Sequence, residues 1–257
     1  MSGAAPTAAT GPAARRSTVG SGRALALAYG VTLARLRSPG RIVGLLLLSL
    51  TSVVAGFAVG RSATADVGDG ATLVANLGLA VIVPVVSLVF GGGAIGDLRE
   101  DKTLIYLWLR PMRRWPVVVG AALAALTATA PIALVPLVLG AALAGVGGGL
   151  VGATALAGAV GVVTYCSLFT VLGVLLRRHI VWGLAYVLIW EGFVALGGRG
   201  VALVAMRTYT RSIVAGLTDT SLTGAEVSVA AGIAVPLVVS ALALALGSWR
   251  LANQDVD

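Results

Sequence analysis

Charged side chains are scarce in this sequence. Only 11% of its 257 residues are Asp, Glu, Lys or Arg, whereas soluble globular domains carry about 25%. By contrast, 58% of the residues are hydrophobic, and the mean hydropathy is +1.00. A chain of this length with so little charge cannot cover a soluble surface. The composition therefore excludes a soluble domain and predicts one membrane domain with several spanning segments.

Cysteine and histidine are almost absent. The single cysteine, Cys166, excludes an intrachain disulfide, and the single histidine, His179, has no second histidine or cysteine near it. Because His179 follows two arginines, we expect it to be solvated at the flank of a spanning segment. The sequence has no Ser/His/Asp set, no metal-ligand spacing and no phosphate-binding loop, so we expect no catalytic residues, no metal and no cofactor in this chain.

Basic residues outnumber acidic ones, giving a formal net charge of +8. The arginines stand between apolar runs and form no single patch, which excludes a nucleic-acid partner and is typical of residues that set membrane topology. They concentrate in residues 15–41, in the loop 97–116, at Arg177 and Arg178, and at Arg250. The opposite loops hold only Arg61, Arg199, Arg207 and Arg211. We predict that both termini are cytoplasmic in a multi-pass protein of the cell (plasma or inner) membrane.

Six apolar runs have roughly the length of a membrane span, which needs about 20 residues. They cover residues 42–60, 73–96, 117–142, 151–176, 180–197 and 228–248, and the fifth is the shortest. We therefore predict an all-α, polytopic fold with six transmembrane helices. Pro84, Pro131 and Pro136 fall inside these runs, where we expect them to kink the helices.

The N-terminal part divides into two segments. Residues 1–22 are Ala, Gly, Ser, Thr and Pro with two arginines, and we expect a disordered cytoplasmic tail. Residues 23–37 place apolar side chains on one helical face, which predicts an interfacial helix ahead of the first span. The alternative is an extension of that span, and Pro39 disfavours it. The single transmembrane domain then covers residues 23–257.

The segment Gly91–Pro116 joins the second run to the third and carries charge of both signs. Leu98, Ile105 and Trp108 share one face of a helix that Pro111 ends, so the segment predicts an amphipathic helix at the membrane surface. Its glycines formally spell G-x-G-x-x-G, but no strand precedes them. We therefore expect either close helix packing or a flexible joint there, and no bound nucleotide.

Several positions of this segment occur together in a known pattern: Glu100, Thr103-Leu104, Leu107, Pro111 and Arg113-Arg114. The segment resembles the one after the second span in ABC transporter permeases of the six-span exporter type (type-2 ABC permeases). In that family it forms a coupling helix that docks in a cleft of the ATPase subunit. One departure is Gly120-Ala121, where relatives often have Gly-Lys. The alternative is a solvated segment whose charges only set topology.

The resemblance implies an elbow helix at 23–37 and the transmembrane subunit of an ATP-driven exporter. Its pathway would form between this chain and a second permease copy or a sister permease, within membrane lipid. Two ABC ATPase subunits would bind ATP and Mg and hydrolyse the ATP, so this chain would not be an enzyme. The implied coupling residues are Asp97, Arg99, Glu100, Asp101, Lys102, Thr103, Leu104, Arg110 and Pro111.

Glu191 is the ionisable residue well inside an apolar run, and such residues are costly and often functional. We expect either a role in the pathway or its gating, or a cap at a helix break. Its carboxyl group would be protonated, paired with Arg199 or Arg207, or placed beside Glu191 of a second copy in a dimer. Glu191 also supports a second hypothesis, an ion- or proton-coupled secondary transporter. A third is a membrane enzyme or scaffold.

The loop 198–227 is the long external one. It contains a stretch that predicts either a short helix on or in the outer leaflet or an ordinary interfacial loop.

Overall fold

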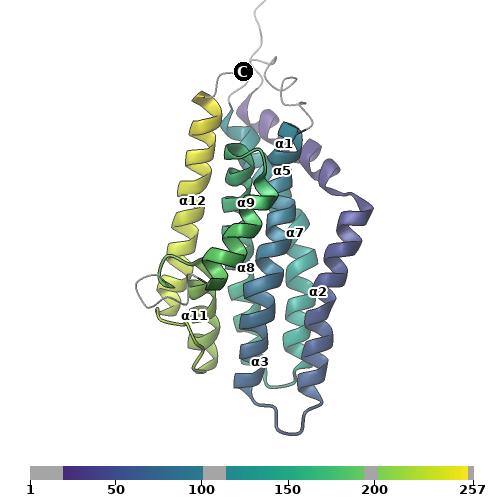
Figure 1. The fold of residues 1–257 in the computed structure, drawn as a ribbon, viewed down its shortest axis with the longest axis vertical. Helices are drawn as coiled ribbons and strands as arrows, with labels where there is room; N and C mark the ends of the chain where they lie inside the picture. Colours follow the sequence, from purple (N-terminus) through teal and green to yellow (C-terminus); the bar gives the residue numbers. More distant parts are fainter. Residues whose placement is uncertain (1–19, 101–113, 194–201, 254–257) are drawn as a thin grey trace, which may run out of the picture.

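The computed structural model describes residues 20–100, 114–193 and 202–253. Within these ranges all regular structure is helical, and long helices run side by side along one axis (Figure 1). Five helices are long and apolar enough to cross a membrane: Pro39–Gly60, Val67–Asp97, Trp115–Leu143, Gly148–Leu175 and Val229–Asn253. The all-α prediction is confirmed, and these five helices indicate a membrane protein.

Four of these helices are single elements: α2 (Pro39–Gly60), α7 (Trp115–Leu143), α8 (Gly148–Leu175) and α12 (Val229–Asn253). The second in sequence is a composite of α3 (Val67–Leu73), η1 (Val74–Ile82), α4 (Val83–Ser87), η2 (Leu88–Gly92) and α5 (Gly93–Glu100). Segments η1 and η2 are π-helical.

The π-helical segment η1 ends just before Pro84. At its end the Val83 N–H donates to the Gly78 carbonyl, five residues back. A proline lacks the N–H of a regular helix, and its ring clashes with the carbonyl four residues earlier. A wider turn at this point relieves that conflict. The irregularity expected at Pro84 therefore takes the form of a π-helical stretch.

The fifth apolar run differs from the others. It forms α9 (His179–Ala185) and then η3 (Tyr186–Phe193), elements of seven and eight residues. The rest of that run lies outside the described residues. The described part is too short to count as a membrane span, so the sixth transmembrane helix stays a prediction.

The N-terminal helix α1 (Ser21–Leu36) agrees closely with the segment predicted at 23–37. It ends before Ser38, and α2 begins anew at Pro39, so α1 is not an extension of the first span. It packs on α7 at Gly120, where an added Cβ would lie 2.9 Å from the Ala28 Cβ. Its expected place at the membrane surface stays a prediction.

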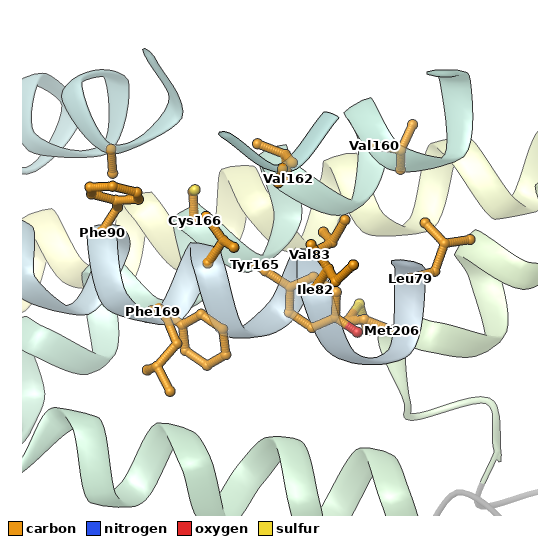
Figure 2. Packing of buried hydrophobic residues seen from close by; sticks show 14 of the residues in the cluster. Leu79, Ile82, Val83, Phe90, Val160, Val162, Tyr165, Cys166, Phe169 and Met206 are labelled. Atoms are coloured by element: carbon orange, nitrogen blue, oxygen red, sulfur yellow. The ribbon is translucent and has the colours of Figure 1, made fainter. Parts of the chain in front are cut away.

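Helix α8 forms the centre of the bundle. In its most apolar stretch 72% of residues are buried, against 22% in α2 and 17% in α12. Tyr165, Cys166 and Phe169 of α8 pack with Ile82 and Phe90 of the composite helix (Figure 2). The outer helices α2 and α12 instead expose large apolar side chains such as Leu47 and Leu242. A bilayer or another membrane subunit is the surrounding that suits such faces.

Candidate functional site

The composite helix extends beyond its apolar part into the charged segment. Element α5 runs through Glu100, so Asp97, Arg99 and Glu100 all belong to this helix. The remaining predicted coupling residues lie outside the described residues: Asp101, Lys102, Thr103, Leu104, Arg110 and Pro111. The amphipathic helix expected after Glu100 therefore stays a prediction.

Asp97 contacts two other helices. Its Oδ2 accepts a hydrogen bond from Arg41 Nη2 at 2.8 Å, and its Oδ1 lies 3.7 Å from His179 Nε2. Arg41 lies in the first turn of α2, and His179 is the first residue of α9. We call these three side chains the Asp97 cluster. One carboxylate thus joins the ends of α2, α5 and α9, whereas the family resemblance implied only a contact with an ATPase.

The prediction that His179 is solvated is wrong, because its side chain is completely buried. The imidazole lies directly on the backbone of the composite helix. A Cβ added at Gly96 would be 2.2 Å from His179 Nδ1, and one at Gly92 would be 2.7 Å from its Cδ2. These two glycines, one turn apart, create the space for the ring. The run of glycines correctly predicted close packing, but nothing in the sequence identified the side chain that fills the space.

The same glycines also bring α8 close. A Cβ at Gly173 of α8 would be 2.6 Å from the Gly92 carbonyl oxygen, and one at Gly91 would be 3.0 Å from the Cys166 carbonyl oxygen. Such distances leave no room for a side chain. The packing interpretation of the G-x-G-x-x-G pattern is therefore confirmed.

Glu191 lies at the other end of the α9–η3 pair and is only 2% exposed. Its carboxylate accepts three hydrogen bonds of 3.0 Å, from the Tyr186 hydroxyl and from the backbone N–H groups of Met206 and Arg207. The Arg207 guanidinium donates to the Glu191 backbone carbonyl. The Tyr165 hydroxyl faces the same carboxylate without the geometry of a hydrogen bond.

Met206 and Arg207 are the first two residues of α11 (Met206–Thr218), so Glu191 caps that helix from a distant part of the chain. The preceding residue, Ala205, provides no side-chain cap. A carboxylate at a helix N-terminus satisfies free N–H groups and interacts favourably with the helix dipole. We call this arrangement the Glu191 cap. Of the two roles expected for Glu191, the geometry favours the cap at a helix break.

The sequence analysis did not identify Tyr186 as a partner, because side chains that share a face of an α-helix are three or four residues apart and Tyr186 lies five before Glu191. In a π-helix the hydrogen bonds connect residues five apart. Element η3 therefore brings Tyr186 and Glu191, which are five apart, onto one face. An aromatic hydroxyl five positions before an intramembrane acid is the signal that was available.

Helix α11 is buried, so the loop predicted at 198–227 is not an ordinary interfacial loop. Arg211, 6% exposed, donates to the Thr223 carbonyl and to Asn76 Oδ1 of η1. On the α12 side, a Cβ at Gly232 would be 2.9 Å from the Tyr209 carbonyl oxygen. The helix is thus held at its start by Glu191, in its middle by Asn76 and along one side by α12 (Figure 1).

Within the described residues no group of three or more His, Cys, Asp or Glu side chains is placed to hold a metal ion. The chain matches no protein-family model and no curated protein. The arrangement of its own residues therefore carries the functional argument.

Proposed function

We propose that this chain is the transmembrane subunit of an ATP-driven ABC exporter. One observation carries the proposal: the composite spanning helix continues without a break through Glu100, and so through the first four residues of the charged segment 97–116. Movement of that segment would therefore move a spanning helix directly. A solvated loop that only set topology would not need a continuous helix at this position.

In this proposal α9 and η3, with the residues that follow them, form the fifth of six spans. The end of the bundle that carries α1, α5 and the end of α12 faces the cytoplasm (Figure 1). Arg35, Arg41 and Arg250 belong to elements at this end, and Arg37 and Arg114 directly flank α1 and α7, which agrees with the positive-inside rule. Both termini are then cytoplasmic.

A chain with six spans supplies one wall of a pathway, so two permeases pair and two ATPase subunits bind beneath them. ATP and Mg bind to the ATPases, and closure of the ATPase dimer displaces the segment 97–116 of each permease. The exposed apolar faces of α2 and α12 provide surface for lipid and for the second permease. This chain contributes pathway and coupling, and no catalytic group.

The Glu191 cap disfavours the secondary-transporter hypothesis. A proton-carrying carboxylate exchanges its proton with water along a pathway, whereas Glu191 is buried and held by two main-chain N–H groups. Protonation would weaken both of these charge-assisted hydrogen bonds and loosen α11. The geometry favours a structural acid.

Reversing the charge of Glu100 and Asp101 to Lys tests the proposal. Like charges placed across an interface cost several kcal/mol, and about 1.4 kcal/mol changes binding tenfold. We expect normal insertion, because added positive charge agrees with a cytoplasmic loop. Association with the ATPase and transport should be lost together, as measured by co-purification from native membranes and by transport in vesicles.

Glu226→Lys is the control, since it reverses a charge near the start of α12, at the opposite end of the bundle. It should leave ATPase association unchanged. Retained association in the Glu100/Asp101 variant would reduce the segment to a topology signal and remove the main support for an ABC permease.

A further inference from the structure

We propose that the Asp97 cluster is a positioning device that makes α9 and α2 follow the movements of the segment 97–116. The inference deepens the proposed function, because it assigns the residues that would transmit an ATPase-driven displacement. It rests on that function only for the source of the movement. The linkage of the three helices is a property of this chain alone.

The first argument is the sharing of one carboxylate. Asp97 uses one oxygen for Arg41 and turns the other toward His179. Asp97 lies three residues before the end of α5, and its partners begin α2 and α9. A displacement of α5 must therefore break these contacts or carry both partner helices with it. Since His179 is completely buried, separating it from its surroundings would open a cavity beside the carboxylate.

The second argument is the packing between α9 and the composite helix. His179 and Gly183 lie four residues apart, on one face of α9. His179 fills the space above Gly92 and Gly96, while a Cβ at Gly183 would be 2.1 Å from Leu88 Cδ1. The two helices are thus in contact over two successive turns with no free space. Close-packed interiors transmit displacement because they have little compressibility.

The third argument is what α9 connects to. Twelve residues after His179, the same helical pair ends in the Glu191 cap, which holds the start of α11. At about 1.5 Å per residue this is a distance of roughly 18 Å. Contacts therefore continue along α9 and η3 from the Asp97 cluster to the buried helix α11.

Distances between spin labels on the full chain in lipid nanodiscs test the linkage. Val43 of α2 and Val181 of α9 are exposed at 55% and 62% and accept labels, in a background where Cys166 is replaced by Ala. We expect a narrow distribution of label distances in the parent chain and a broad one in Asp97→Asn and His179→Ala. The single variant Arg41→Asp should also broaden the distribution. The double variant Arg41→Asp/Asp97→Arg, which swaps the two charges, should restore the narrow one.

The control is Asp69→Asn, which removes a carboxylate at the other end of the same spanning helix. Its distribution should match that of the parent chain. If Asp97→Asn and His179→Ala keep the narrow distribution, or if Asp69→Asn broadens it equally, the proposed linkage is wrong.

A second arm adds ATP to the complex of the chain with the ATPase that co-purifies from native membranes. The parent chain should shift its Val43–Val181 distance, and His179→Ala should lose the shift while ATP hydrolysis continues. If His179 only stabilised the fold, His179→Ala would lower the distance shift and ATP hydrolysis together. A shift that persists in His179→Ala overturns the inference. Failure of any ATPase to co-purify with the parent chain contradicts the proposed function, while the first arm still decides the linkage.

Discussion

At the scale of single residues, Glu191 and Arg211 are buried charges that bind mostly main-chain groups. Glu191 accepts from two backbone N–H groups, and Arg211 donates to a backbone carbonyl and an amide side chain. A buried charge without partners costs several kcal/mol. Because Glu191 binds the first N–H groups of α11, and Arg211 joins α11 to Asn76 of η1, each charge fixes the place of α11 and not only its own side chain.

Replacement of Glu191 should destabilise the protein through α11. In Glu191→Gln the neutral amide has a single acceptor oxygen, so one N–H of α11 loses its acceptor and the other keeps only an uncharged one. We expect a loss of about 1–3 kcal/mol in the free energy of unfolding. Glu191→Lys should prevent assembly, because it places a cation at the positive end of the helix dipole. Thermal unfolding of the detergent-purified chain measures both.

The matched control is Tyr186→Phe, which removes a hydrogen bond to the same carboxylate but leaves the helix capped. Its loss should be about 1 kcal/mol. Equal losses in Tyr186→Phe and Glu191→Gln would show that the main-chain bonds do not stabilise α11. If Glu191→Gln keeps full stability but alters transport with pH, Glu191 has a role in the pathway instead.

The sequence located Glu191 as a buried acid but could not identify most of its partners. Two of them are backbone N–H groups of Met206 and Arg207, and a backbone group leaves no trace in residue identity. His179 illustrates the reverse error. Its neighbours Arg177 and Arg178 indicated a solvated end, while the space it fills is created by glycines more than 80 residues earlier, a long-range fact that no local pattern contains.

At the scale of elements, α2 and α7 cross at glycines. A Cβ at Gly56 would be 2.0 Å from the Gly140 carbonyl oxygen, and one at Gly140 would be 2.4 Å from the Ser52 carbonyl oxygen. Close approach through small residues is a common source of helix association in membranes, where no hydrophobic effect drives it.

Gly56→Val should separate α2 from α7 and lower stability by about 1–3 kcal/mol, as overpacking does. Gly44→Val on the same helix is the control, because an added Cβ there meets nothing within 4 Å. Both variants carry the same change in helix propensity, so the difference between their unfolding midpoints in detergent reports the crossing alone. Equal midpoints would contradict a tight α2–α7 contact.

Hydropathy predicted five of the long helices to within six residues of their ends, since continuous apolar runs depend on composition alone. It did not predict that the second helix contains η1 and η2, or that α9 passes into η3. Element η1 ends just before Pro84, whereas nothing in the hydropathy marks η2 or η3. The separation of α1 from α2 was predictable, because Pro39 is favoured in the first turn of a new helix.

At the scale of the whole molecule, the distribution of arginines predicts which end is inside. In a Cys166→Ala background, a cysteine at the exposed Arg37 should react with a membrane-impermeant thiol reagent only after the cells are permeabilised. A cysteine at the exposed Ser221 should react in whole cells. Ser212, 2% exposed, is unsuitable because burial would protect it on either side. The reverse pattern of labelling would invert the proposed orientation.

The Glu191 cap also has a consequence for synthesis. Glu191 leaves the ribosome before Met206 and Arg207, and proteins fold from their N-terminus as they are made. Until those two residues emerge, α9 and η3 carry a carboxylate without its main-chain partners, in surroundings where such a charge is costly. The α9–η3 pair therefore cannot reach its final position ahead of α11. A chain that stops between them would present an unfinished helix to the proteases that remove failed membrane proteins.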